Sequence, residues 1–116
     1  MKTLSYLTGN LLFDGNLVFK PDAKLRIKIQ DVTVRGDEEL VYEKDIPFEA
    51  KSLAIFRYLP FELKDFEFDA SRRYELTAHV DQQANGQIES GDYATDRGYP
   101  VVTAMTEVDM NLVRVP

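Results

Sequence analysis

LRIKIQDVTV, residues 25–34, carries the clearest structural pattern in the chain. Up to Ile29 its odd-numbered residues are apolar and its even-numbered residues are polar. A period of two is typical of a β-strand with one face on a core and the other in water. After Asp31 the pattern changes phase, because the apolar residues Val32 and Val34 occupy even positions. We therefore expect either a β-bulge at this point or a strand that is covered on both faces.

Similar short apolar segments fill the rest of the chain. Residues 53–63 read as a strand that is apolar on both faces, and residues 64–73 as a connection between two sheets with Phe66 and Phe68 tucked beneath it. In the strand that starts at Tyr74, the even-numbered residues are apolar and the odd-numbered ones are polar. Strands are predicted over roughly 4–13, 25–34, 40–46, 53–63 and 74–81, then over a return strand holding Ile88 and Tyr93, and finally over 108–115.

Two dipeptides provide the strongest turn signals. Asp14-Gly15 is a hairpin signal between the first strand and the apolar residues 17–19, and the sequence leaves open whether it forms a true hairpin or only a bend. Asn85-Gly86 fits a type I′ turn, in which both central residues have positive φ. These two turns fix where neighbouring strands should reverse direction.

The pattern predicts an all-β fold. About seven short strands with turns between them are typical of an antiparallel two-sheet β-sandwich. No helix is predicted, because no window keeps apolar residues at i, i+3, i+4 and i+7. The 116 residues suit one domain, and we place its bounds at 1–116.

Composition excludes several classes of function. The net charge of −6 argues against binding nucleic acid or an anionic membrane surface. The absence of cysteine excludes disulfides, thiolate zinc sites and cysteine nucleophiles in this sequence. No apolar run of 18 residues is present, so no membrane insertion is predicted. Without an apolar leader or a lipobox cysteine the chain as written is expected in the cytoplasm, or in the periplasm or at the outer membrane if an export signal was removed.

Asp31 is the most unusual candidate acid. If its strand stays regular, the side chain points toward the core, where a carboxylate needs charged or backbone donors or its pKa rises. One interpretation is structural, with Arg72 or Arg73 as the partner. The alternative is a hydrolytic or self-processing enzyme centred on Asp31, with the loop carboxylates Asp92 and Asp96 nearby. No second catalytic group can be assigned, so the structural interpretation is preferred and no catalytic residue is proposed.

Other titratable residues point to no metal site and no cofactor. His79, the one histidine, falls on the polar face of its strand with Asp81 and is expected to be exposed. The acidic residues of the segment 65–69 match no calcium loop, and we interpret them as a solvated edge that discourages aggregation.

Aromatic residues indicate binding and framework roles. Phe56 and Tyr58 lie on the second face of the predicted strand 53–63, and an exposed aromatic pair is typical of a surface for another protein or for a homodimer. Tyr74 begins a strand just after a turn, as does the tyrosine corner of sandwich domains, whose hydroxyl bonds to backbone a few residues upstream. A small ligand held by the tyrosines of residues 93–99 ranks last among the binding hypotheses.

Several segments, taken in order, resemble the YbaY/YscW-like family of small bacterial lipoprotein domains. They span nearly the whole chain: LTGNL (7–11), LRIKIQDVT (25–33), PFEL (60–63), RYELTA (73–78), YPVVT (99–103) and EVDMNL (107–112). The resemblance implies a β-sandwich without catalytic residues, in which Asp31 and Tyr74 belong to the framework. Members of this family include pilotins of type III secretion, which bind the outer-membrane secretin. The resemblance therefore implies a chaperone-like, protein-binding role with an envelope or secretin component as the partner.

Overall fold

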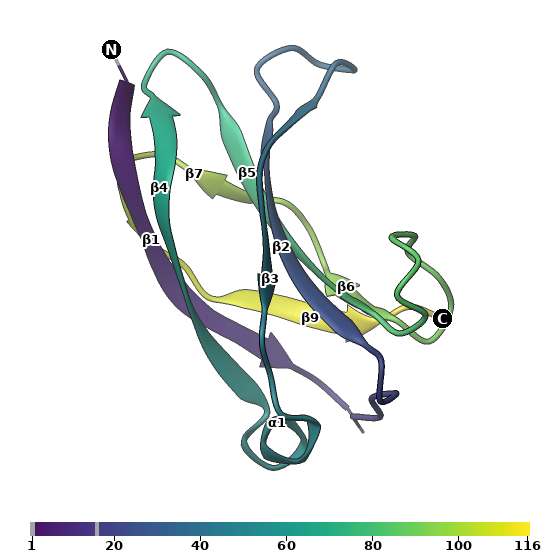
Figure 1. The fold of residues 1–116 in the computed structure, drawn as a ribbon. Coiled ribbons are helices and arrows are strands. Elements are labelled where there is room, and N and C mark those ends of the chain that lie inside the picture. Colours follow the sequence, from purple (N-terminus) through teal and green to yellow (C-terminus); the bar gives the residue numbers. More distant parts are fainter. Residues whose placement is uncertain (1, 16) are drawn as a thin grey trace.

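The alternating stretch forms the strand β2 (Lys24–Asp31) of a computed structural model that describes residues 2–15 and 17–116. Leu25, Ile27 and Ile29 are buried, as the period of two predicts. Figure 1 shows a curled sheet with one short helix at the lower end of the molecule, and β2 lies next to the edge strand β3. The other elements are β1 (Lys2–Phe13), β3 (Glu39–Ile46), α1 (Ala50–Phe56), β4 (Tyr58–Asp69), β5 (Tyr74–Asp81), β6 (Tyr93–Thr95), β7 (Tyr99–Val101), β8 (Met105–Glu107) and β9 (Met110–Arg114).

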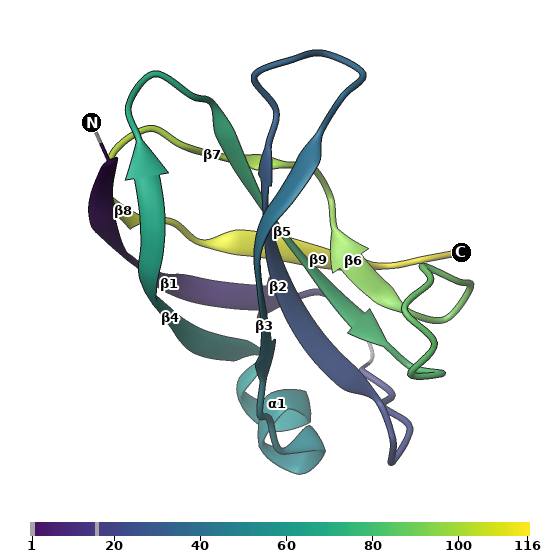
Figure 2. The same ribbon diagram turned by 45° about the horizontal axis from the view of Figure 1, so that its top comes forward.

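The strands belong to one mixed sheet. Their order is β3-β2-β5-β6-β9-β1-β4, with β7 paired to β5 and β8 paired to β1. Strands β8 and β9 run parallel to β1, while the other pairs are antiparallel. The all-β prediction is confirmed, but the antiparallel two-sheet sandwich is wrong. A continuous path of paired strands leaves no break between two sheets, and the single sheet curls into a half-barrel instead (Figures 1 and 2).

The two ends of this sheet are β3 and β4, which lie side by side in Figures 1 and 2. Side chains link them where no backbone ladder does. The Tyr42 hydroxyl donates to the carbonyl of Lys64 at 3.4 Å, and the Lys44 ammonium donates to the carbonyl of Glu62 at 3.5 Å. The half-barrel therefore encloses one core, with its open seam between two strand edges.

The change of phase after Asp31 coincides with the end of the strand. β2 ends at Asp31, which keeps the buried parity of the strand, so the predicted strand 25–34 is three residues too long. A bulge does lie beside Gln30, since Ile29 pairs with Tyr42 but Gln30 pairs with Leu40, and its extra residue, Val41, is on β3. A bulge on the neighbouring strand leaves the alternation of β2 unchanged, so it does not account for the change of phase.

The segment predicted as a connection is part of β4. Its Phe66 and Phe68 are buried, as expected, but they belong to a strand of the sheet, in which Phe68 pairs with Thr3 of β1. Asp65 has φ 66°, and the register between β1 and β4 shifts beside it. This bulge moves the buried positions from odd to even numbers, which is why the alternation alone did not indicate one continuous strand.

The predicted strand 53–63 is wrong in its first half. Residues 50–56 form α1, which ends where Arg57 adopts φ 65° and its amide donates to the carbonyl of Leu53. Leu53 is the one buried residue of α1. Two turns of helix are too short for a full amphipathic repeat, so the periodicity could not indicate it.

Neither of the two turn signals forms a tight hairpin, which decides the alternative at Asp14-Gly15 and corrects the prediction at Asn85-Gly86. The first strand pairs with β4, β8 and β9, and residues 17–20 form no strand, so Asp14-Gly15 makes no hairpin. Gly86 has φ 80°, but Asn85 does not have a positive φ, so no type I′ turn forms. Instead the loop 82–92 connects β5 to β6, and Ile88 is exposed within it.

The core lies inside the curl of the sheet. Among the described residues, no helix is long and apolar enough to cross a membrane. Aromatic rings pack edge to face in the core, as in the pair Phe66 and Tyr74 with centroids 5.0 Å apart. The buried apolar residues are Leu7, Leu11, Phe13, Leu25, Ile27, Ile29, Leu53, Phe61, Leu63, Phe66, Phe68, Tyr74, Leu76, Ala78, Val80, Tyr93, Tyr99, Val101, Met110 and Leu112.

Candidate functional site

An apolar groove lies where α1 meets β4. Phe56 is the last residue of α1 and Tyr58 the first of β4, so the αL conformation of Arg57 between them brings both rings to one side. Their exposed fractions are 63% and 50%. We call this hollow of about 250 Å³ the aromatic groove; it is lined by Glu49, Ser52, Leu53, Phe56, Tyr58, Leu59 and Pro60.

The arrangement differs from the prediction, which placed Phe56 and Tyr58 on one face of a single strand. Both residues are nevertheless exposed and both contribute to one concave surface. Glu49 is the one charged residue among those that line it. A mostly apolar hollow with two exposed aromatic rings suits an apolar side chain of a partner.

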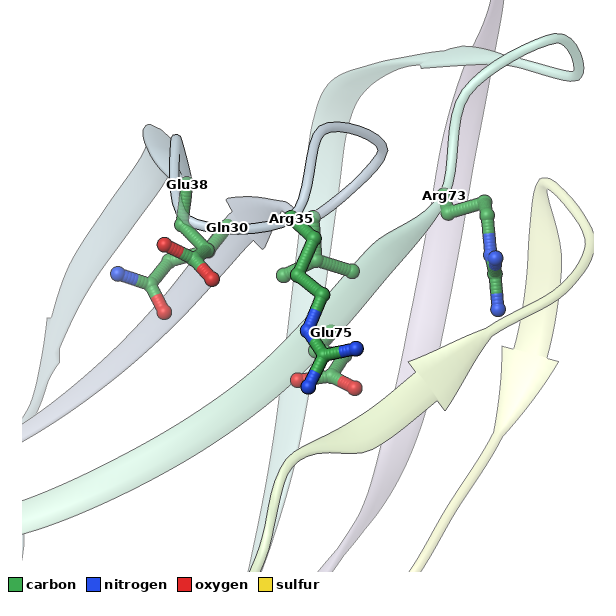
Figure 3. A pocket seen from close by; sticks show the side chains of 6 residues that line it. Gln30, Arg35, Glu38, Arg73 and Glu75 are labelled. Atoms are coloured by element: carbon green, nitrogen blue, oxygen red, sulfur yellow. The ribbon is translucent and has the colours of Figure 1, made fainter.

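A second hollow, of mixed charge, lies beside the turn between β2 and β3. In Figure 3 the side chain of Arg35 extends toward Glu75, while Arg73 points away from that pair. Glu38 and Gln30 line the other side of the hollow. Two arginines and two glutamates balance one another, so this surface has no net charge to select an anion or a cation.

Asp31 is a fully partnered carboxylate. It is 6% exposed. Its Oδ1 accepts hydrogen bonds from the Thr33 amide at 2.9 Å and the Thr33 hydroxyl at 2.6 Å, and its Oδ2 accepts one from Arg72 Nε at 2.7 Å. The Thr33 hydroxyl, then the Thr33 amide and Arg72, outweigh burial and hold the pKa of Asp31 below its usual value.

These contacts support the structural interpretation of Asp31. A general acid at neutral pH needs a raised pKa, and the pKa of Asp31 shifts in the opposite direction. The partner is Arg72, one of the two arginines considered. Tyr74 likewise makes the contact of a tyrosine corner, since its hydroxyl accepts a hydrogen bond from the amide of Asp69 at 3.2 Å.

The lowered pKa of Asp31 predicts how the free energy of unfolding depends on pH. A carboxylate with a depressed folded-state pKa stabilises the protein above its unfolded pKa, and this contribution is lost as the pH falls through the folded pKa. We expect Asp31→Asn to lower the free energy of unfolding at pH 7 by about 1–2 kcal/mol, allowing for the partly exposed arginine. Urea unfolding from pH 7 down to about pH 2 should show the difference shrinking below about pH 4.

The exposed Asp37 provides the matched control for that series. Asp37→Asn should unfold like the wild type at every pH, since a surface substitution without close partners has little effect on stability. A difference between wild type and Asp31→Asn that stays constant down to the lowest pH would contradict the role of the charged carboxylate.

His79 lies in a buried polar cluster that the sequence did not indicate. Its exposed fraction is 8%, and its Nε2 is 2.7 Å from Oδ2 of the fully buried Asp92. Asp81 is also buried, so the prediction that His79 and Asp81 face water is wrong. The loop 82–92 lies against these side chains, because the amide of Gly86 donates to Asp81 and the amides of Gln82 and Glu89 donate to Asp92, the partner of His79. We call His79, Asp81 and Asp92 the His79 cluster.

Asp92 organises this loop. Its Oδ1 accepts from the amide of Gln82 at 2.9 Å and its Oδ2 from the amide of Glu89 at 3.0 Å. Burial alone would raise the pKa of Asp92, but the hydrogen bonds from His79, Gln82 and Glu89 outweigh it and lower the pKa. Asp96, which the enzyme hypothesis grouped with Asp92, is exposed and instead accepts a hydrogen bond from the Tyr99 hydroxyl.

One sequence signal could have indicated the cluster. His79 and Asp81 are two residues apart and so share a strand face, and Asp92 directly precedes the return strand. A tight hairpin at Asn85-Gly86 would pair Ala84 with Gln87 and, five residues further from the turn, His79 with Asp92, so the predicted turn already placed these two residues opposite each other.

Comparison with known proteins establishes the fold. No model of a known protein family matches the chain, and no curated protein sequence matches it. Among solved structures, an alternative pilotin from the type II secretion system of Vibrio cholerae matches with a TM-score of 0.68 and 19% sequence identity. The match covers 98% of this chain and 99% of that chain. At this identity the likeness shows a pilotin-like fold.

Proposed function

We propose that this chain is a non-catalytic, chaperone-like module that binds a segment of a secretin or of another envelope protein. The observation that carries the proposal is the likeness of fold to a secretion pilotin over almost the whole length of both chains. The proposal also agrees with the resemblance of the sequence to lipoprotein domains of the pilotin kind. The fully partnered Asp31, with its lowered pKa, gives no support to the alternative of a carboxylate enzyme.

The aromatic groove is the binding surface that the proposal requires. Binding energy at protein interfaces concentrates in a few aromatic or arginine anchors that fill pockets. Phe56 and Tyr58 are exposed rings beside the apolar side chains of Leu53, Leu59 and Pro60. An apolar segment of the partner that settles in this groove would cover both rings at once.

The prediction concerns the double variant Phe56→Ala with Tyr58→Ala. We expect its affinity for the secretin of the same organism, or for the peptide that carries the binding segment, to fall by at least about tenfold, since each lost anchor costs more than about 1 kcal/mol. Overlapping labelled peptides that tile the secretin, read by fluorescence anisotropy, would locate the segment and measure the loss.

The double variant Ile88→Ala with Met105→Ala is the matched control. Both residues are at least as exposed as Phe56, and neither lines the groove. Its affinity should equal that of the wild type, and both variants should keep the wild-type circular dichroism. Failure of the wild type to bind any secretin peptide would overturn the proposed partner. Unchanged affinity in the Phe56/Tyr58 variant would overturn the proposed surface.

A further inference from the structure

The His79 cluster is built from two neighbouring strands. His79 and Asp81 lie on the outer face of β5, on the side opposite the core residues Ala78 and Val80. Val80 pairs with Tyr93 on β6, so Asp92, one residue before, comes opposite Asp81. The register of this antiparallel pair brings Asp92, the last residue of the loop 82–92, to the end of β5, and the amides of Gln82 and Glu89 hold its carboxylate there.

Donor atoms of these three side chains converge. One ligand atom from each residue lies within 4.8 Å of the other two. All three residues are buried, with Asp92 fully buried and Asp81 6% exposed. Two carboxylates and an imidazole at this spacing are a set of ligands that a divalent metal ion accepts.

A second observation points to a ligand. Asp81 Oδ2 accepts a hydrogen bond from the amide of Gly86 at 2.6 Å, but its Oδ1 is buried and has no hydrogen-bond partner. A buried carboxylate oxygen without a partner is costly, because it has lost its hydration without gaining a donor. A cation held between Asp81 and the other two residues would remove that cost.

Neighbouring charges allow a cation here. Two cations face this site across β2 and β5, because Lys24 pairs with Asp81 and Arg26 pairs with His79. Arg26 Nε lies 2.8 Å from Asp45 and 3.9 Å from Glu43, so two carboxylates already offset the charge of Arg26. The two carboxylates of the His79 cluster would neutralise a divalent ion.

We propose that His79, Asp81 and Asp92 form a binding site for a divalent transition metal ion, with zinc as the first choice. The imidazole favours zinc over calcium, which prefers six to eight oxygen ligands. Ligands of a zinc ion at about 2.0–2.2 Å are about 3–4 Å apart, so the side chains need to move by only about 1 Å. The amides of Gln82 and Glu89 would then orient the Asp92 carboxylate from the second coordination shell.

The bound ion would tie the loop 82–92 to the end of β5. Residues 83–88 of this loop are exposed, so little apolar burial holds it. Metal binding to the folded state alone stabilises that state. The site is structural in this proposal and is separate from the aromatic groove, so failure of either proposal leaves the other intact.

Zinc titration of the metal-free full chain tests the proposal. We expect one zinc ion per chain by isothermal titration calorimetry at micromolar zinc, a melting temperature that rises with zinc, and no comparable response to calcium. In ¹⁵N–¹H spectra of the wild type, zinc should shift the signals of residues 79–92 and the imidazole nitrogens of His79. Absence of zinc binding, or shifts confined to other residues, would overturn the proposal without any variant.

Variants then identify the ligands. Asp81→Asn removes the carboxylate with the unpartnered oxygen and should reduce zinc affinity by at least about 100-fold, beyond the ~10–100-fold effect of second-shell changes. Asp96→Asn, which changes an exposed carboxylate outside the cluster that bonds to the Tyr99 hydroxyl, is the matched control and should bind like the wild type. Wild-type zinc affinity in a folded Asp81→Asn variant would overturn the assignment of Asp81.

Discussion

Gly9→Ala is expected to lower the free energy of unfolding by about 3 kcal/mol, at the upper end of what overpacking costs. A Cβ at Gly9 would lie 1.6 Å from the carbonyl oxygen of Val108 and 2.6 Å from its carbonyl carbon. Both atoms are backbone, so no side-chain rotation can relieve the contact. Urea unfolding monitored by circular dichroism measures the loss.

The effect is large because Val108 cannot easily move away. Its amide donates to the carbonyl of Thr8 at 2.9 Å, which holds it against β1. On either side of this contact, β1 pairs in parallel with β8 and with β9. Displacing Val108 would therefore disturb the two pairings that join the C-terminal strands to the long first strand.

Gly98→Ala is the matched control for Gly9→Ala. The atoms nearest a Cβ at Gly98 belong to the flexible side chain of Glu75, which can rotate away. We expect a loss below about 1 kcal/mol, as for most surface substitutions. Equal losses for the two variants would mean that the close approach of Val108 does not restrict position 9.

Local alternation predicted the strands well where they were regular. The stretch 25–31 and the apolar residues of 74–80 follow the period of two, and their core residues are buried as expected. Alternation shows only that one face of each strand is buried, and this is true both of a sandwich and of a curled sheet. The parallel pairing of β1 with β8 and β9 depends on contacts between distant residues, so the sequence pattern could not distinguish the two architectures.

Irregular backbone accounts for the other differences. Arg57 and Asp65 both have positive φ, a conformation that is uncommon for arginine and that aspartate adopts more often but not regularly enough to mark the position in the sequence. Arg57 separates a helix from a strand, and Asp65 changes the phase of β4. A prediction from periodicity assumes a regular backbone, so at such points it joins two elements into one or splits one element into two.

The candidate sites also differ in whether the sequence pattern could indicate them. The sequence indicated Asp31 because this charged residue occupies a position with the parity of the apolar residues of its strand. It indicated Tyr74 because this residue begins a strand just after a turn. The His79 cluster depends on how the loop 82–92 folds back over β5, and that fold is fixed by hydrogen bonds to Asp92 and Asp81. Polar side chains that become buried under a loop carry no apolar pattern, so periodicity assigns them to the surface.

Asp92→Ala is expected to lower the free energy of unfolding by about 4 kcal/mol in metal-free buffer, in the range for breaking a buried charged pair. The substitution leaves the amides of Gln82 and Glu89 without their acceptor and removes the partner of His79. Because Asp92 is fully buried, water cannot replace these hydrogen bonds without opening the loop. Urea unfolding in the presence of a chelator measures the loss apart from any metal.

Two further variants separate the effect of the charge of Asp92 from the effect of its hydrogen bonds to the loop. Asp92→Asn keeps the size of the side chain and one acceptor oxygen, so its loss should lie between those of wild type and Asp92→Ala. Asp96→Ala removes an exposed carboxylate that accepts a hydrogen bond from the Tyr99 hydroxyl, and it should cost about 1 kcal/mol or less. If Asp92→Ala cost no more than Asp96→Ala, the loop 82–92 would be held by its apolar contacts. Since residues 83–88 are exposed, we expect the polar contacts to Asp92 to provide that stability.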